Sequence, residues 1–377
     1  MKIKKEIYIA IEIKVREYLS QIILSFFLAI KGYRVFLGSK DQIISLIKQK
    51  KNNNGILLYK AGIHKNLIKI IDKKTNSHVV IDQEVAPGYT DKKVVAESIR
   101  GSFHKETLKK IDLYLSPNQR LYKMSKKLLS LMRGKVVFSG WPRIDLWKPK
   151  YKFLFQEKIN EIDLKYKDYI LFNSDFGYVT NDYINEATSY SLWGYEKNKY
   201  KQNKFYNQQV EYAKEAYSEF KVFSDKIKKF SQNNIHQLIL IRIHPSENLK
   251  AWKDIFYGYK NIKLLSPLDD ITPWIYCAKY VLHRGCTTAL QAVFMNKPTG
   301  YFISDKKFKS QIKNKKFNYD ISDKIFNMSE LLKKINDSKS GNITENTKKK
   351  LNRELGIKDR DSVDYIIKEL DKLLCHQ

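Results

Sequence analysis

The feature that most constrains the fold of this chain of 377 residues is a regular alternation of short apolar runs with helix-like stretches. Such runs, separated by amphipathic stretches, are typical of parallel strands that helices cover on both faces. In the first part of the chain they lie at 7–13, 33–39, 55–60, 78–82, 113–116 and 135–140. The pattern predicts an α/β domain with a Rossmann-like parallel sheet over residues 1–150.

A second region of the same kind follows a break in the pattern. The stretch "GWPRIDLWKPKY" (140–151) contains two prolines and interrupts the alternation. Strand-like runs resume at 168–177, and after a Tyr-, Asn- and Lys-rich stretch (180–230) they continue at 237–243, 261–265, 280–283 and 299–303. We therefore predict a second Rossmann-like domain over 151–320 and a helical tail over 321–377 that packs back on the first domain.

The charge of the chain is strongly positive, with a formal net charge of +30 at pH 7. The basic residues are 60 lysines and ten arginines scattered along the whole sequence, and no nucleic-acid-binding module accompanies them. We therefore do not predict nucleic-acid binding. A surface this basic is instead expected to attract anionic lipid headgroups or polyanionic glycans.

The sequence predicts no membrane span, no secretory signal and no cysteine-based metal site. The longest apolar run, "IILSFFLAI" (22–30), is much shorter than the roughly 18–20 residues of a membrane span, and no small-residue cleavage site follows the N-terminus. Cys277, Cys286 and Cys375 have no metal-ligand spacing. We expect a cytoplasmic protein, with neither bound metal nor cofactor, whose basic surface contacts the inner face of the plasma membrane.

Polar side chains follow several predicted strands at the point where each strand ends. In open α/β sheets, ligands bind beyond the carboxyl ends of the strands, so these groups are candidate site residues. They are Asp82-Gln83-Glu84, Asn173 to Asp175, His244-Pro245 and Arg284-Gly285.

The segment "HRGCTTALQAVFMNKP" (283–298) has the composition of a phosphate site. Gly285 allows a tight turn, and Thr287 or Thr288 can cap the following helix, whose first backbone N–H groups favour an anion. Arg284 adds a fork of donors suited to phosphate, and we expect it to have no buried partner of its own. The alternative is an ordinary capped helix after a strand.

The segment "RIHPSENLKAW" (242–252) supplies the second half of this predicted site. A neutral His244 can donate one hydrogen bond to a phosphate, and a protonated one can pass a proton to a leaving group. Pro245 ends the strand and rigidifies its exit. The predicted donor-binding residues are Arg242, His244, Pro245, Ser246, Glu247, Arg284, Gly285, Thr287, Thr288 and Asn173.

The first domain carries two further sets of candidates. Asp82 and Glu84 fall on the same side of a continued strand, where a carboxylate could act as base or nucleophile, although a turn with a solvated acid is the alternative. Glu12, Arg16 and Glu17 have helix-compatible spacing and could bind an acceptor. A set of salt bridges at the helix start is the favoured reading of those three.

Together these segments resemble the bacterial surface carbohydrate biosynthesis proteins, relatives of retaining Kdo transferases and, more distantly, of bacterial sialyltransferases. The resemblance is carried, in order, by "IEIKVREYLSQIILSFFLAIKGYRVFLGS", "VVIDQEVAPGY", "SGWPRIDLW", "ILFNSDFG", "RIHPSENLKAW" and "HRGCTTALQAVFMNKPTGYF". It implies a GT-B-like fold in which two Rossmann-like domains face a cleft. It also implies a nucleotide-sugar donor on the second domain, a glycan or lipid-linked glycan acceptor on the first, and no obligatory metal.

One motif departs from the resembled pattern. Where the family has an acidic pair followed by glycine, this chain reads Asp82-Gln83-Glu84-Val85. Only Glu84 remains ionisable in the position of the pair, so the resemblance makes it the catalytic acid, with Asp82 holding the turn. His244 completes the predicted catalytic set.

The function predicted from the sequence is therefore a metal-independent glycosyltransferase of surface polysaccharide synthesis, of the kind that builds capsule or lipopolysaccharide. The resemblance favours a CMP-linked ulosonic acid, such as Kdo or a nonulosonate, as donor. Two enzyme alternatives are transfer of a polyol phosphate from a CDP donor and epimerisation of a nucleotide sugar. A non-catalytic scaffold in envelope assembly is a third alternative.

Overall fold

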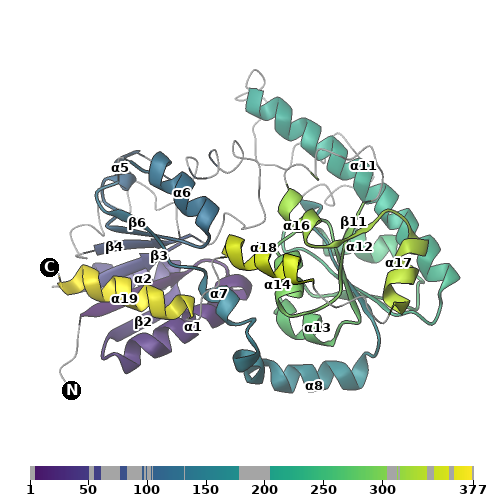
Figure 1. Cartoon of the computed structure of the whole chain (residues 1–377), viewed down its shortest axis with the longest axis horizontal. Helices are drawn as coiled ribbons and strands as arrows, with labels where there is room; N and C mark the ends of the chain where they lie inside the picture. The colour runs from purple at the N-terminus through teal and green to yellow at the C-terminus, as the bar shows by residue number, and fades with distance from the viewer. Residues whose placement is uncertain are drawn as a thin grey trace. The chain divides into compact units, whose positions relative to one another are not determined.

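The structure is a computed structural model that describes residues 5–50, 55–60, 77–82, 96, 99, 103, 105–130, 132–177, 204–303, 312, 315–337, 344–355 and 361–375. The chain forms two compact units (Figure 1). Unit 1 combines Met1–Lys152 with Glu345–Gln377, and unit 2 is Phe153–Thr344. The C-terminal residues thus belong to the same unit as the N-terminal ones.

Unit 1 contains a six-stranded sheet in the order β2-β1-β3-β4-β5-β6, in which all neighbouring strands are parallel. Every residue of β3, β4 and β5 is buried, as expected for strands covered on both faces. The strands are β1 (Glu6–Ile11), β2 (Arg34–Ser39), β3 (Gly55–Tyr59), β4 (Ser77–Ile81), β5 (Leu113–Ser116) and β6 (Lys135–Phe138).

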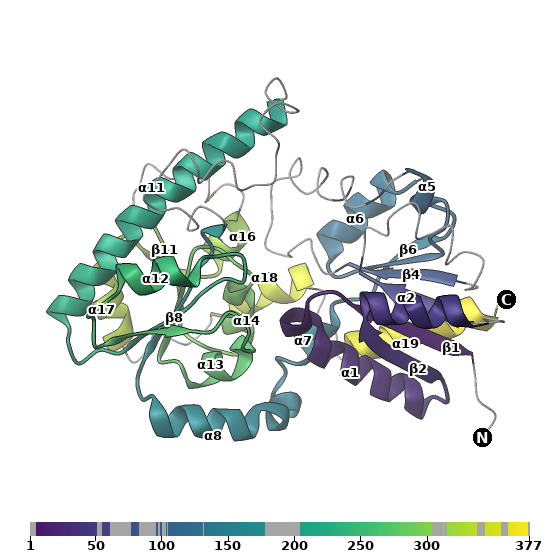
Figure 2. The same cartoon turned by 180° about the vertical axis from the view of Figure 1, so that it is seen from behind.

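The helices of unit 1 come from both ends of the chain. They are α1 (Lys14–Ile30), α2 (Lys40–Gln49), α5 (Lys105–Leu108), α6 (Gln119–Leu128), α7 (Pro142–Asp145), α18 (Glu345–Leu355) and α19 (Ser362–Cys375). Helix α19 packs against α1 and α7 (Figure 2). The buried Asp145 carboxylate accepts hydrogen bonds from the backbone N–H groups of Ser362 (3.0 Å) and Val363 (3.1 Å), which fixes the start of α19.

Unit 2 contains the second six-stranded parallel sheet, in the order β12-β11-β10-β7-β8-β9. Its strands are β7 (Ile170–Asn173), β8 (Ile239–Arg242), β9 (Ile262–Leu265), β10 (Tyr280–His283), β11 (Thr299–Phe302) and β12 (Asp323–Ile325). Two parallel sheets confirm the predicted α/β class with two Rossmann-like domains.

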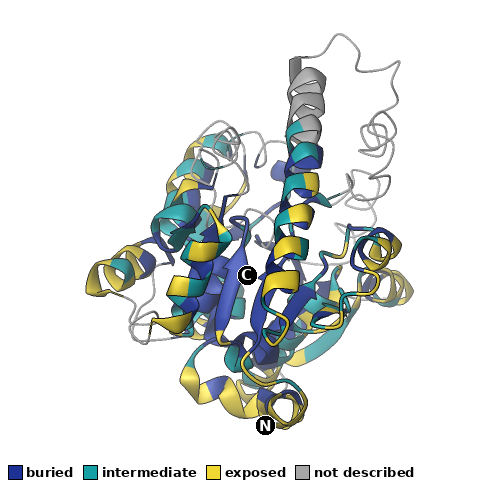
Figure 3. Cartoon of the chain, turned by 90° about the vertical axis from the view of Figure 1, so that its right-hand side faces the viewer, coloured by how far each residue is buried: buried dark blue, intermediate teal, exposed yellow. Residues whose placement is uncertain are grey.

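The helices of unit 2 cover both faces of this sheet. They are α8 (Gln156–Lys165), α11 (Lys204–Asn233), α12 (Leu249–Ile255), α13 (Ile271–Cys277), α14 (Thr288–Phe294), α16 (Lys316–Asp320) and α17 (Met328–Asn336). A 3-10 helix at Pro149–Phe155 contains the point in the chain where unit 1 ends and unit 2 begins. Helix α11 supplies Phe223, which stacks on Phe172 of β7 with ring centroids 4.2 Å apart. Figure 3 shows the buried strands between helices whose outward faces are exposed.

The segment predicted as a helical tail divides between the two units. Residues 323–325 form β12, an edge strand of the unit 2 sheet, and α17 follows it in the same unit. A strand of three residues is too short to show a hydrophobic period in the sequence. Its pairing with β11 in the folded chain is what defines it. In the part of the chain that the structure describes, every helix is too short or too polar to cross a lipid bilayer.

Candidate functional site

The sheet of unit 2 places several predicted residues at one edge. Its first strand, β7, lies in the centre, with β8 and β9 on one side and β10 to β12 on the other. In sheets of this order the connections reverse direction beside the first strand, and ligands bind at the carboxyl ends there. Asn173, Arg242 and His283 are the last residues of β7, β8 and β10.

Asn173 presents an unused donor at this edge. Its side chain is only 3% exposed, and its amide nitrogen has no hydrogen-bond partner among the described residues. Leaving a buried polar group unsatisfied costs about 1–3 kcal/mol. The arrangement suits a site in which a ligand supplies the missing acceptor.

His244 lies one strand away and is held by its neighbours. Its backbone N–H donates to Ser174 Oγ (2.9 Å), and that hydroxyl is 3.1 Å from the carbonyl of Arg242. The Nδ1 atom accepts a hydrogen bond from the backbone N–H of Ser246 (3.2 Å), with Ser246 Oγ at 2.7 Å. An Nδ1 that accepts carries no proton, so the neutral imidazole bears its hydrogen on Nε2. The half-buried ring is thus set up as a hydrogen-bond donor through Nε2.

The other side chains of this segment hold the backbone around His244. Arg242 Nη2 donates to the carbonyls of Pro267 (2.8 Å) and Asp269 (2.9 Å). Glu247 is buried and accepts from the Phe176 N–H (2.7 Å) and the Trp252 indole N–H (2.9 Å), and burial raises its pKa to about 7.

Arg242 and Glu247 therefore fix the loops after β7, β8 and β9, and their predicted contact with a donor stays a prediction. Pro245 is exposed and Ser246 is half-buried. Trp252 is buried in the core of unit 2.

The expectation that Arg284 has no buried partner was wrong. Its side chain is 1% exposed and forms an ion pair with Glu219 of α11, while its other terminal nitrogen donates to the Asp175 carbonyl. Its guanidinium also lies over the Phe176 ring, 4.1 Å from the ring centroid. The sequence did not indicate this ion pair, because Glu219 lies on α11, far from Arg284 along the chain. Arg284 therefore braces the turn after β7 whatever it contributes to a ligand.

The turn after β10 depends on Gly285 and on a buried histidine that the sequence did not single out. Gly285 has a φ of +94°, a value that favours glycine. His283 is fully buried, and its Nδ1 accepts from the Gly285 N–H (2.8 Å) while Nε2 lies 3.0 Å from Ser322 Oγ. Burial lowers the pKa of His283 to about 3. This residue stays neutral and shapes the turn.

The threonine cap predicted for the next helix is not formed at Thr287. Thr287 is the N-cap residue of α14, but its dihedral angles are helical and its side chain makes no capping hydrogen bond. A cap needs extended backbone geometry for the side-chain oxygen to reach back to the first N–H groups. Thr288 begins the helix and interacts with Cys286, whose pKa is raised by burial.

A further charged pair lies at this edge, and only its acid was among the residues that the sequence singled out. Lys315, just before α16, forms an ion pair with Asp175, two residues beyond Asn173. Burial favours the neutral acid, but the charges of Lys315 and Arg284 outweigh it and hold the pKa of Asp175 below its ordinary value. One lysine among 60 gives no signal in the sequence.

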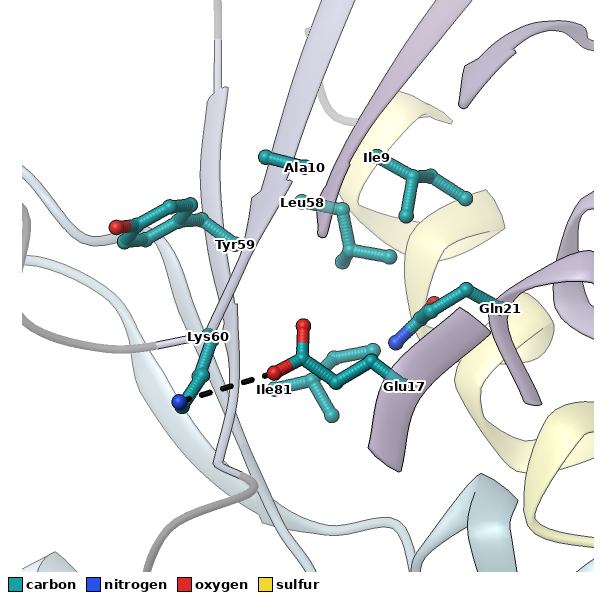
Figure 4. A pocket seen from close by; sticks show the side chains of 8 residues that line it. All are labelled: Ile9, Ala10, Glu17, Gln21, Leu58, Tyr59, Lys60 and Ile81. Carbon is teal, nitrogen blue, oxygen red and sulfur yellow. Dashed lines mark ion pairs between the residues drawn. The ribbon is translucent and has the colours of Figure 1, made fainter. Parts of the chain in front are cut away.

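In unit 1, a small cavity lies beside the ends of β1 and β3, the corresponding reversal point of that sheet (Figure 4). Its volume is about 10 Å³, enough for one water-sized group. Glu17 faces Lys60 across it at 3.7 Å. The buried Gln21 Oε1 has no hydrogen-bond partner among the described residues. The lining residues are Ile9, Ala10, Glu17, Gln21, Leu58, Tyr59, Lys60 and Ile81.

The three predicted acceptor residues have different positions. Glu17 is buried and accepts from the backbone N–H groups of Glu12 (2.9 Å) and Ile13 (3.2 Å), and burial raises its pKa. Glu12 pairs with Lys60 (3.1 Å) and Lys40 (3.4 Å), which come from the end of β3 and the start of α2 and are not among the three predicted residues. Arg16 lies half-buried in the first turn of α1.

Of the two predicted catalytic acids in unit 1, only Asp82 can be placed. Asp82 is buried at the end of β4 and accepts a hydrogen bond from the Tyr114 hydroxyl of β5. Glu84 lies outside the described residues, as does Gln83. Across the described positions, no group of three or more His, Cys, Asp or Glu side chains is placed to hold a metal ion.

Comparison with known proteins identifies the fold. No protein-family model and no curated protein matches the chain. Among solved structures, it is similar to the wall teichoic acid polymerase TagF, with a TM-score of 0.59 and 13% identity over 100% of this chain and 90% of that one. It is also similar to Staphylococcus aureus MnaA bound to UDP (TM-score 0.52, 12% identity, 98% and 97% covered).

A third similar structure is a glycosyltransferase from Rickettsia africae (TM-score 0.51, 9% identity, 98% of each chain covered). At these identities the likeness shows the fold alone. The chain therefore has a GT-B-like fold built from two Rossmann-like domains.

Proposed function

We propose that the protein is a transferase of bacterial surface polysaccharide synthesis that binds a nucleotide-activated donor at the carboxyl edge of the unit 2 sheet. The observation that carries this proposal is the unsatisfied, buried amide nitrogen of Asn173 at the reversal point between β7 and β10. A phosphate or nucleotide oxygen there would supply the acceptor that the protein lacks. The similar structures of a teichoic acid polymerase and of a UDP complex support the same class of substrate.

In this proposal, His244 acts on the phosphate side of the donor. Its Nε2–H group can donate to a phosphate oxygen as negative charge accumulates on the leaving nucleotide, the kind of stabilisation that usually dominates such reactions. Donors of this kind can stabilise the charge without a metal, and we propose that the enzyme is metal-independent.

On the acceptor side, we place a hydroxyl group of a glycan or lipid-linked glycan at the cavity of unit 1. A hydroxyl can donate to Gln21 Oε1 and accept from Lys60, and the cavity admits one group of that size. Glu84 remains the predicted acid of this unit. The contact of Asp82 with Tyr114 supports a positioning role for Asp82.

Two candidate donors are each favoured by a different observation. The sequence resemblance favours a CMP-linked ulosonic acid. A second candidate is transfer of a polyol phosphate from a CDP donor, favoured by the similarity to TagF, one form of which was soaked with CDPG (TM-score 0.58). Only the second reaction adds phosphorus to the product, so mass spectrometry of the product separates them. An epimerase would need no acceptor at all.

The deciding experiment is calorimetric titration with CMP, CDP, UDP and GDP of the wild type and of Asn173→Leu. Leucine has the same branching and number of side-chain heavy atoms, but it lacks the amide and has a larger volume, so urea unfolding without nucleotide serves as the control for overpacking. We expect nucleotide affinity to fall about tenfold or more, the equivalent of one lost hydrogen bond to a charged group. If the wild type binds none of the four nucleotides, the proposal fails and the scaffold alternative gains support.

The membrane is the remaining proposed partner. Helix α1 exposes Tyr18, Phe26 and Ile30 along one face, with exposed fractions of 43%, 61% and 57%. Lys14 lies over the Tyr18 ring, and the one acidic residue of this helix, Glu17, is buried. An apolar face without exposed acid, on a chain of net charge +30, suits the surface of an anionic bilayer.

A further inference from the structure

Lys315 is a buried lysine whose ammonium group is delivered to the ligand edge of the unit 2 sheet. Its side chain is only 7% exposed, whereas its ion-pair partner Asp175 is 28% exposed. Asp175 follows β7 by two residues, and the same carboxylate influences His283 and Cys286 at the end of β10 and the start of α14. The ammonium therefore lies beside the ends of β7 and β10, the strands at the reversal point of this sheet.

Gly285 makes the path of this side chain possible. A Cβ atom at Gly285 would lie 2.6 Å from Lys315 Cδ and 2.9 Å from Lys315 Cβ, closer than carbon atoms can approach. The lysine stem thus fills the space that the missing Cβ leaves, in a turn whose φ of +94° also favours glycine. The turn after β10 and the position of Lys315 are fitted to each other.

Stability alone is a weak explanation for such a pair. Burying an ammonium and a carboxylate carries a desolvation penalty that their attraction often only balances, and apolar replacements are frequently neutral or stabilising. An ammonium has three N–H donors, so it can hold Asp175 and a second anionic oxygen at the same time. The partly exposed position of Asp175 leaves the pair within reach of a ligand.

We propose that Lys315 binds a phosphate group of the donor nucleotide, and that Asp175 positions its ammonium for that contact. The inference rests on the proposed function and extends it. It adds a cationic side chain that binds phosphate and that lies outside the segments 242–252 and 283–298.

The test compares Lys315→Met with Lys316→Met by calorimetric titration. Lys316 is the neighbouring lysine, exposed and paired with Asp320, and serves as the matched control. Each variant is titrated with CDP, UDP and GDP and with cytidine, uridine and guanosine, which lack phosphate. We expect Lys315→Met to lower affinity for the diphosphates about tenfold or more and to leave nucleoside affinity unchanged, whereas Lys316→Met changes neither.

A double variant separates direct contact from the effect of stranding Asp175. In Lys315→Met/Asp175→Asn no unpaired carboxylate remains, so recovery of diphosphate affinity would show that repulsion by Asp175 caused the loss, and would overturn the proposal. Continued weak binding supports it. If the wild type binds a diphosphate and Lys315→Met binds it equally well, this inference alone is overturned. A wild type that binds no nucleotide would overturn the proposed function together with it.

Discussion

His244, at the carboxyl edge of the unit 2 sheet, has a ring whose hydrogen-bonding partners are set by the protein. Its Nδ1 accepts from the Ser246 backbone, which leaves Nε2–H as the donor. We predict that His244→Ala lowers the transfer rate by about 10²-fold or more, the usual scale for a charge-stabilising donor, without loss of folding. The exposed His236 provides the control variant His236→Ala. Steady-state kinetics and far-UV circular dichroism measure both, and wild-type turnover in His244→Ala would remove this residue from the mechanism.

Arg284 leads to a different prediction, because its partner Glu219 is also buried. Arg284→Ala strands that carboxylate, so we expect a loss of about 3–5 kcal/mol in the free energy of unfolding. In Arg284→Met/Glu219→Gln no buried charge is left unpaired, and most of the stability should return. Urea unfolding of the single and double variants measures both values. Equal losses in the two would show that packing, and not the ion pair, sets the contribution of Arg284.

Buried His283 should make the free energy of unfolding depend on pH in a defined direction. Its pKa in the folded protein is about 3, below the ordinary value of 6.5, because burial disfavours the charged form. Between these values the unfolded chain binds the proton and the folded one does not, so stability falls as pH drops below about 6.5, by about 1.4 kcal/mol per pH unit. Urea unfolding at several pH values should show a shallower acid slope in His283→Gln. Identical slopes would contradict the assignment.

At the scale of the element, the exposed face of α1 makes the membrane proposal testable. We predict that Phe26→Ser/Ile30→Ser lowers binding to phosphatidylcholine vesicles that contain phosphatidylglycerol by tenfold or more, since each buried apolar side chain contributes about 1.5–3 kcal/mol. Tyr257→Ser/Leu268→Ser is the control, because both residues are highly exposed in unit 2. Co-sedimentation measures binding. If the α1 variant binds lipid normally but dissociates a dimer in analytical ultracentrifugation, the face contacts a second copy instead.

At the scale of the whole molecule, the two units have separate hydrophobic clusters, and the C-terminal helices belong to the first unit. We therefore predict two calorimetric unfolding transitions. A bound nucleotide should raise only the transition of unit 2, by mass action. Asp145→Ala, which releases the backbone N–H groups at the start of α19, should lower only the other transition. A single transition that both changes shift equally would show that the units unfold together.

The sequence by itself determined the class of the fold and the position of the candidate site residues at the ends of strands. Short apolar runs between amphipathic stretches identify buried parallel strands because burial on both faces demands apolar residues at successive positions. Strand ends could be located for the same reason, and so could the polar residues at or just beyond them, such as Asn173 and His244.

Only the tertiary structure decided what each of those polar residues contacts. Glu219 reaches Arg284 from α11, Lys315 reaches Asp175 past Gly285, and Lys60 meets Glu17 across the cavity of unit 1. Each pair joins elements that are distant in sequence, and local periodicity contains no information about such partners. The reason is physical: a strand forms from the pattern of its own residues, whereas a buried charge is defined by whichever group the folded chain brings beside it.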